Sequence, residues 1–340
     1  MGRSELTVDL AAIRHNAKRL LEALGGAQLW AVVKANGYGH GATDVAGAAL
    51  AAGASGLCTA TVPEALALRR QLTSARILVM GPASTAEVAR AREARLELAV
   101  VDERPLPHGV PLHLKLDTGM GRYGLAELPA PPAQVVGLMS HLATADSDPA
   151  YANRQIERFR EATAPYSGYL RHIANSAAAL RIAAARFDAG RCGIALYGIS
   201  PFGGDPGDDG LVPALSWRSE LAQVKRLAPG ESTGYGREFV ARNPTWIGIV
   251  PVGYGDGFRR GLTGTTVLVG GEPRKVVGRI SMDSFAVELP GRLRPGTPVT
   301  LLGDGILAEA HARVAGTIAY ELGCRIESRP ERASRTVIGA

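Results

Sequence analysis

The fold is decided by the stretch Leu29-Trp-Ala-Val-Val-Lys34-Ala-Asn-Gly-Tyr38-Gly-His-Gly41. Its first five residues are apolar, which is typical of a short strand buried on both faces, and a glycine-rich turn follows at once. Lys34 therefore lies at the carboxyl end of a core strand, where parallel α/β folds bind their ligands. Loss of hydration at such a site favours the neutral amine, which can form a Schiff base or act as a general base. A lysine that only caps the strand and reaches back to water is the alternative.

Lysine is scarce in this chain, which strengthens the chemical interpretation of Lys34. Only five of the 38 basic Lys and Arg residues are lysine, so arginine supplies nearly every ordinary surface cation. Two of the five, Lys34 and Lys115, stand at the ends of apolar runs. Their placement indicates a role in chemistry rather than in surface charge.

Strand and helix patterns alternate on both sides of this stretch. We expect eight strands, at residues 29–33, 56–60, 77–80, 98–101, 112–116, 135–139, 169–174 and 187–194. Helical patterns cover residues 10–24, 42–52, 63–72, 85–95, 150–162 and 176–185. Eight is the number of parallel strands that closes a TIM-like (β/α)8 barrel. An open doubly wound sheet is the alternative, but the chain carries no Rossmann glycine fingerprint.

Two connections of this barrel are short for crossover helices. Residues 102–111 and 123–133 are proline-rich, so we expect the barrel to lack covering helices there.

The sequence pattern changes after the last predicted barrel strand. Residues 200–210 resemble a linker, and short β-type runs punctuated by Gly and Pro follow, with a helical pattern over 310–322. We therefore expect an N-terminal strand within residues 1–10 that packs on the C-terminal domain, a barrel over 11–211, and a mostly-β domain over 212–340.

Composition narrows the function classes. The net charge of +6 comes from dispersed arginines, and aromatic residues make up only 5% of the chain. A nucleic-acid-binding protein would be expected to have a basic stripe with stacking aromatic residues, and this sequence has none. Three widely spaced cysteines suit a reducing compartment and give neither a disulfide framework nor a metal site. No signal segment or membrane span is evident. We expect a cytoplasmic protein that acts on a small molecule.

Polar residues follow the predicted strands and converge on one face of the barrel. They are Lys34, Lys115 with Asp117, His141, Asn175 with Ser176, and Arg191. Ser176 opens a helix, where its hydroxyl and free backbone N–H groups suit an anion, and Gly193 and Ile194 could add further N–H groups. A phosphate beside a strand-end lysine suggests pyridoxal phosphate, although flavin and sugar-phosphate sites share this geometry.

Eight motifs in order resemble those of the alanine racemase family. The stretch around Lys34 resembles its pyridoxal-phosphate attachment motif, which usually has Ala where Gly37 stands. The other seven motifs are Lys115-Leu-Asp-Thr-Gly-Met-Gly-Arg122, Ser140-His-Leu-Ala-Thr-Ala-Asp146, His172-Ile-Ala-Asn-Ser176, Arg191-Cys-Gly-Ile194, Thr233-Gly-Tyr235-Gly-Arg237, Gly253-Tyr254-Gly-Asp-Gly257 and Val277-Gly-Arg279-Ile-Ser-Met282-Asp283. They span almost the whole chain. The resemblance implies a cytoplasmic homodimer that uses pyridoxal 5'-phosphate to interconvert L-alanine and D-alanine for peptidoglycan precursors.

The resemblance also implies catalytic roles. Lys34 would hold the cofactor covalently and act as the base on one face of Cα, and Tyr235 of the partner subunit would act on the other. Arg191 would meet the pyridine nitrogen, where many related enzymes place a carboxylate, and would suppress transamination. His141 would help to stabilise the Tyr235 phenolate.

Further matches cover the phosphate, the substrate and the access route. Tyr38, Ser176, Gly193, Ile194 and Tyr320 match the phosphate-binding set. Arg122 and the backbone N–H of Met282 match groups that hold the substrate carboxylate. Lys115 matches a lysine that is often carbamylated and positions Arg122; a plain lysine paired with Asp117 is the alternative. Asp146, Tyr254, Arg279 and Asp283 match family residues that support the site or line its narrow access corridor.

Three rival functions stay open from the sequence. A broad-specificity or serine racemase would use the same scaffold. A decarboxylase of related fold would place a carboxylate where Arg191 stands. A non-catalytic pyridoxal-phosphate carrier would lack the second domain. The short barrel connections and Gly255, which stands where the family usually has Ala, are expected to affect stability or corridor mobility more than chemistry.

Overall fold

The computed structural model describes residues 3–340, which form two compact units. One unit holds residues 12–212, and the other holds the residues up to 11 together with 213–340. Within residues 3–340, no helix combines the length and the apolar character needed to cross a membrane.

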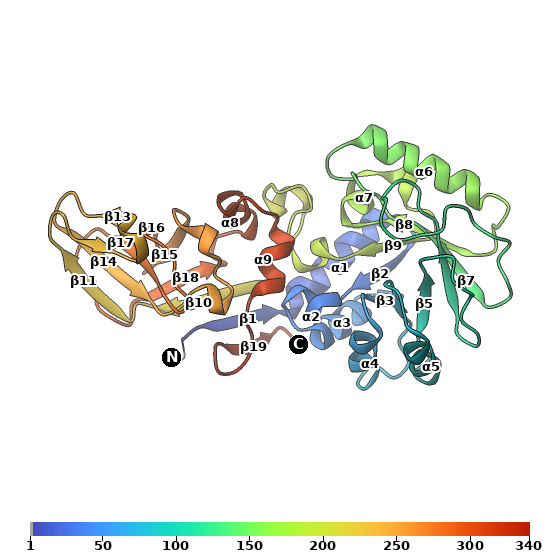
Figure 1. Cartoon of the computed structure of the whole chain (residues 1–340), viewed down its shortest axis with the longest axis horizontal. Helices are drawn as coiled ribbons and strands as arrows, with labels where there is room; N and C mark the ends of the chain where they lie inside the picture. Colours follow the sequence, from blue (N-terminus) through green and yellow to red (C-terminus); the bar gives the residue numbers. More distant parts are fainter. Residues whose placement is uncertain (1–2) are drawn as a thin grey trace. The chain divides into compact units, whose positions relative to one another are not determined.

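Residues 12–212 form a closed barrel of eight parallel strands, which confirms the predicted fold class (Figure 1). β2 pairs in parallel with both β3 and β9, and this pairing closes the sheet on itself. The strands are β2 (Gln28–Val32), β3 (Gly56–Thr59), β4 (Ile77–Val79), β5 (Glu97–Val100), β6 (Leu112–Lys115), β7 (Val135–Met139), β8 (Leu170–Ala174) and β9 (Ala189–Cys192).

Most of these strands are followed by helices, and several of these helices begin at a capping side chain. α4 and α5 each begin at a capping box, formed by Thr61 with Glu64 and by Ser84 with Glu87. The barrel helices are α1 (Leu10–Leu24), α3 (Ala42–Ala51), α4 (Val62–Arg69), α5 (Thr85–Glu93), α6 (Pro149–Thr163) and α7 (Ser176–Arg181), with 3-10 turns η1 (Ala183–Ala185), η2 (Ile194–Tyr197) and η3 (Pro206–Asp209). The predicted helix over 85–95 ends earlier, because Arg95 has a left-handed φ of 52°.

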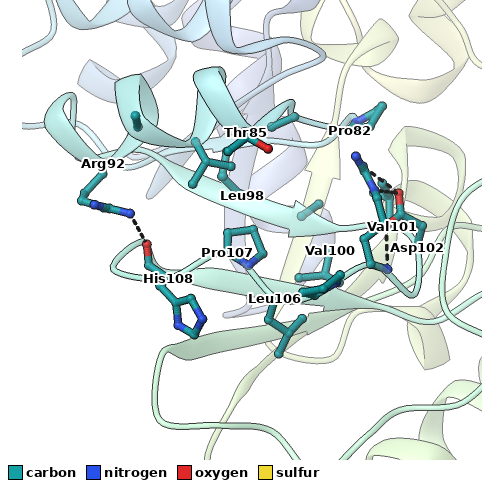
Figure 2. Close-up of a pocket in the computed structure, with 16 residues that line it drawn as sticks. Pro82, Thr85, Arg92, Leu98, Val100, Val101, Asp102, Leu106, Pro107 and His108 are labelled. Atoms are coloured by element: carbon teal, nitrogen blue, oxygen red, sulfur yellow. Dashed lines mark hydrogen bonds and ion pairs between the residues drawn. The ribbon is translucent and has the colours of Figure 1, made fainter.

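The two short connections carry no helix in the described part of the barrel, as their length predicted. One consequence is a groove of about 510 Å³ between α5 and residues 102–108 (Figure 2). Leu98 and Leu106 help to line it, and the Arg92 guanidinium donates a hydrogen bond of 2.7 Å across it to the His108 carbonyl. None of the predicted site residues lies in this groove.

The other unit is built on a nine-stranded sheet in the order β11-β14-β17-β16-β15-β18-β10-β1-β19. β1 lies inside it, antiparallel to β10 and parallel to β19. The rings of Phe258 and Phe285 stack at 4.5 Å in the apolar core of this unit. The strands are β1 (Glu5–Asp9), β10 (Leu215–Glu220), β11 (Gln223–Leu227), β14 (Thr245–Val250), β15 (Thr266–Val269), β16 (Glu272–Val277), β17 (Phe285–Leu289), β18 (Pro298–Leu302) and β19 (Ser334–Ile338), beside the hairpin β12 (Ser232–Thr233) and β13 (Phe239–Val240).

The single helix predicted over 310–322 is wrong. The structure has two helices, α8 (Ala308–Ala315) and α9 (Ala319–Arg325). Gly316 ends the first of them with a φ of 62°, the left-handed conformation that commonly stops a helix and that glycine adopts without strain.

Candidate active site

Lys34 opens a left-handed turn directly after β2. Only Val33 separates it from the strand, and the short segment α2 (Lys34–Tyr38) has positive φ at Ala35, Asn36 and Gly37. Non-glycine residues pay conformational energy for this backbone, so the surrounding contacts must hold it in place. Glu64 does so by accepting a hydrogen bond of 2.8 Å from the Ala35 N–H. The sequence predicted a glycine-rich turn here but not its left-handed course.

A compact group of polar atoms lies where β8 and β9 end. The Ser176 hydroxyl accepts hydrogen bonds from the backbone N–H groups of Gly193 (3.1 Å) and Ala195 (3.4 Å). A Cβ on residue 193 would lie 2.5 Å from the Tyr38 hydroxyl oxygen, so glycine alone leaves room for that phenol. Ile194 begins η2 at the same place. Four of the five residues predicted to bind phosphate are thus brought together.

Arg191 is buried and its guanidinium contacts neutral acceptors. One terminal nitrogen donates to the His172 Nδ1 (2.7 Å) and carbonyl oxygen (2.9 Å), and the other donates to the Ser140 carbonyl (2.6 Å) and the His141 Nδ1 (3.2 Å). The Nε–H is buried without a hydrogen-bond partner among residues 3–340. An orphaned buried donor is costly, and an acceptor such as a pyridine nitrogen would satisfy it.

His141 is held neutral with a defined tautomer. Burial is the main cause that lowers its pKa well below the usual value, and the positive charge of Arg191 adds to it. Since the guanidinium can only donate, the Nδ1 atom of His141 accepts and the proton lies on Nε2. The imidazole can therefore offer an Nε2–H to a nearby oxyanion.

Lys115 is buried at the end of β6. Its pKa is lowered to about 8, mainly by burial and further by the charges of Arg191 and Arg122. The negative charge of Asp117 opposes this shift in the Lys115 pKa. The charges of Lys115 and Asp117 therefore act on each other, and a plain lysine beside Asp117 stays the alternative to a carbamylated one. The Asp117 carboxylate also accepts hydrogen bonds from the N–H groups of residues 119–121 and fixes the turn before Arg122. Arg122 and Asp146 lie on exposed loops that follow β6 and β7.

The remaining predicted residues belong to the unit that contains 213–340. Tyr235 begins a short turn, η4 (Tyr235–Arg237), and its side chain is 69% exposed. Gly234 places this turn against Arg279, because a Cβ on residue 234 would lie 3.0 Å from the Arg279 backbone nitrogen. The Arg279 guanidinium forms an ion pair with Glu238. Tyr235 and Arg279 are thus neighbours.

A second turn of this unit carries Tyr254 and packs against Met282. The Gly255 N–H donates to the Met282 carbonyl (2.9 Å), and both Tyr254 and Met282 are about half exposed. Asp283 accepts a hydrogen bond of 2.6 Å from Arg332, which also pairs with the buried Asp256 of the Tyr254 turn. Tyr320 lies half-buried on α9, whose last residue contacts Gly257 of the same turn: a Cβ there would meet the Arg325 carbonyl at 2.4 Å.

The barrel residues fit pyridoxal phosphate. Lys34 offers an amine at a strand end, the Ser176 and Gly193 region offers N–H and hydroxyl groups for a phosphate, and Arg191 has a buried donor that needs an acceptor. Among residues 3–340, no cluster of three or more His, Cys, Asp or Glu side chains is placed to hold a metal ion.

The sequence assigned no role to three ionisable residues of the barrel interior, of which only His172 belongs to one of the eight motifs. Glu97, His113 and His172 are buried and hydrogen-bonded to one another in a line that ends at Arg191. A signal was present, because each is an ionisable residue within an apolar strand.

Comparison with known proteins matches both units. The family model for the N-terminal domain of alanine racemase covers residues 8–201, and that for the C-terminal domain covers 214–334. Alanine racemase 1 of Bacillus subtilis is 41% identical over 96% of this chain and 91% of its own length. The solved alanine racemase of Streptomyces coelicolor has a TM-score of 0.91 at 39% identity, covering 99% of this chain and 98% of that one. The biosynthetic alanine racemase of Pseudomonas aeruginosa has a TM-score of 0.90 at 36% identity, covering 99% of this chain and 100% of that one.

Proposed function

The chain belongs to the alanine racemase family, and from this premise we propose that it interconverts L-alanine and D-alanine with pyridoxal 5'-phosphate for the supply of peptidoglycan precursors. The observation that carries the cofactor assignment is the buried Arg191, whose Nε–H needs an acceptor, in the same barrel as the strand-end Lys34. When bound, pyridoxal phosphate would make the Cα–H bond of the amino acid acidic.

Two bases on opposite faces of Cα complete this proposal. The Lys34 amine would hold the cofactor and take or return a proton on one face, and the Tyr235 phenol would do so on the other. The Nε2–H of neutral His141 would stabilise the phenolate of Tyr235. A tyrosine pKa normally lies near 10, so this hydrogen bond would help the phenol to act as a base.

Arg191 would keep the ring nitrogen of the cofactor unprotonated. A guanidinium donates hydrogen bonds but does not give up its proton at physiological pH. Arg191 would thereby favour return of the proton to Cα over transamination. Arg122 and the Met282 N–H would hold the substrate carboxylate, and Tyr38, Ser176, Gly193, Ile194 and Tyr320 would hold the phosphate.

A homodimer with shared active sites is part of the proposal, and the exposure of Tyr235 supports it. A phenol that is 69% exposed can reach the barrel of another copy, and in a two-fold dimer each copy would serve its partner in the same way. Asp146, Tyr254, Arg279 and Asp283 would shape an access corridor for a small amino acid. No nucleic acid or membrane partner is proposed, and the cytoplasm is the proposed location.

The activity is tested by incubating the holoprotein with L-alanine in deuterated water. We expect optical rotation to fall to zero while deuterium enters Cα, since each turnover exchanges the Cα proton with solvent. Exchange without loss of rotation would contradict racemisation, and no exchange would indicate a non-catalytic carrier. Faster turnover of serine or several other amino acids than of alanine would favour the broad-specificity alternative.

The lowered pKa of Lys115 predicts that it reacts with carbon dioxide. Only the neutral amine forms a carbamate, and a pKa of about 8 leaves much more of it near neutral pH than an ordinary lysine would. Protein equilibrated with ¹³C-labelled bicarbonate should therefore show a carbamate ¹³C resonance. In the unmodified protein, reactivity should rise as the pH increases through about 8, where the ammonium loses its proton.

Lys115→Arg should remove this resonance, whereas the exposed Lys18→Arg should leave it unchanged. An equally strong resonance in Lys115→Arg would assign the carbamate to another amine.

A further inference from the structure

A line of hydrogen-bonded side chains crosses the interior of the barrel. Arg191 donates to the Nδ1 of His172 (2.7 Å), whose Nε2 lies 2.8 Å from the Nδ1 of His113. The Nε2 of His113 lies 2.7 Å from a carboxylate oxygen of Glu97. Arg76 contacts both oxygens of that carboxylate, at 2.7 and 3.0 Å. The line thus joins strands β9, β8, β6 and β5.

The chemistry at its two ends fixes the direction of every hydrogen bond. Arg191 can only donate. Burial would raise the pKa of Glu97, but hydrogen bonds from His113 and Arg76 hold it at about 2, so the carboxylate only accepts. Burial is the main cause that lowers the pKa of both His113 and His172, and each is neutral with one proton. That proton must lie on Nε2 in both rings, because either Nδ1–H tautomer would set two donors against each other.

The barrel is shaped around this pair of imidazoles. A Cβ on residue 137 would come 2.3 Å from the Nδ1 of His113, so Gly137 leaves the space that the ring occupies. The Trp30 indole stacks on His172 with an interplanar angle of 13° and meets His113 edge-on at 5.7 Å. These contacts fix the planes of both rings, which fixes the hydrogen bonds in their planes.

The line also connects Arg191 to a carboxylate, which Arg76 pairs with directly. All acceptors of its terminal nitrogens are neutral, although a buried cation without a negative partner is costly. Glu97 reaches it only through the two imidazoles, each of which polarises the next hydrogen bond. Orienting groups of this kind stand behind the residues that touch a cofactor in many sites.

We propose that Glu97 and His113 are positioning residues, which act through His172 to hold the Arg191 guanidinium in one orientation with its Nε–H presented to the cofactor ring. The identity of that ring rests on the proposed function. Glu97 and His113 touch neither cofactor nor substrate in this assignment, and His172 is the link that transmits their effect.

The direction of the line can be tested without cofactor. In apoprotein carrying ¹⁵N-labelled histidine, the resonances of His113 and His172 should report neutral Nε2–H tautomers that do not titrate through the neutral pH range. Glu97→Gln keeps an oxygen that can accept from His113 but removes the charge. It should shift the Nε2–H resonances of His113 and, less strongly, of His172, because the polarisation is passed along the line.

The effect on the cofactor is read from binding and spectra. Glu97→Gln should weaken binding of pyridoxal phosphate to the apoprotein by about tenfold. This is the size of effect expected when a hydrogen bond to a charged carboxylate is replaced by one to a neutral amide. It should alter the pH dependence of the bound cofactor's absorbance and lower kcat for alanine more than it changes KM. The control is Glu157→Gln, which removes a carboxylate from an exposed ion pair on α6 and should change none of these.

Several results would overturn the proposal. They are an Nδ1–H tautomer at His172, an unmoved His172 resonance in Glu97→Gln, or a Glu97→Gln protein that loses thermal stability but keeps its cofactor affinity and spectra. The wild-type tautomers decide the direction of the line even if Glu97→Gln fails to fold. A wrong racemase assignment would be recognised separately. The wild-type protein would then show no racemisation of alanine, but its histidine resonances would be as described.

Discussion

Replacing Lys34 by alanine is expected to abolish both cofactor attachment and racemisation. The substitution removes the amine that would hold pyridoxal phosphate and the base on one face of Cα. Loss of one acid–base group alone typically costs 10²–10⁴-fold, so kcat should fall by more than about 10⁴-fold. The absorbance of covalently bound cofactor should disappear at the same time. Both quantities can be followed on one preparation, by visible spectroscopy and by polarimetry with L-alanine.

Lys18→Ala is the matched control, because Lys18 is an exposed lysine on α1 to which no role in the site is assigned. It should retain full activity and the wild-type spectrum. A Lys34→Ala protein that still binds cofactor covalently would assign attachment to another lysine, with Lys115 the first to examine because burial lowers the pKa of its amine.

The barrel could be predicted because its strands are continuous apolar runs between turn residues. All four residues of β3 and of β5 are buried, so the composition of such segments reports burial directly. Closure into a barrel followed from the number of strands. The helix break at Gly316 was missed because apolar Val314 and Ile318 continue the helical period across it, yet both are exposed. Periodicity cannot tell an exposed apolar residue from a buried one.

Part of the candidate site could be predicted from the sequence and part could not. Residues at strand ends, such as Lys34, Lys115 and Arg191, follow from topology, since the carboxyl ends of parallel strands meet at one face. The left-handed turn after Lys34 did not, because Ala35 carries no signal for positive φ and adopts it through a contact with Glu64, distant in sequence.

The line from Arg191 to Glu97 depends on which strands become neighbours in three dimensions. The strand predicted over 98–101 excluded Glu97, because a carboxylate next to an apolar run is typical of the end of a strand. Its burial makes sense only once His113 and Arg76 are placed beside it.

Tyr235→Phe is expected to stop racemisation while leaving the cofactor in place. The phenol is the proposed acid–base group on the face opposite Lys34, and a phenyl ring of nearly the same shape cannot exchange a proton. Turnover in both directions should fall by about 10²–10⁴-fold. The visible spectrum should be unchanged, and Cα exchange in deuterated water should survive for only one enantiomer, the one whose proton faces Lys34. Unchanged racemisation in both directions would refute the two-base assignment.

Mixing Tyr235→Phe with Lys34→Ala tests whether each site draws on two chains. If Lys34 and Tyr235 of one site come from different copies, a hybrid dimer holds one fully native site and one doubly substituted site. Random exchange of subunits should then restore about a quarter of wild-type activity, because about half of the dimers are hybrids with one working site each. If both residues of a site came from the same chain, every site in the mixture would lack one base and no activity would return. Recovery of activity on mixing therefore distinguishes a site shared between two chains from a site contained in one chain.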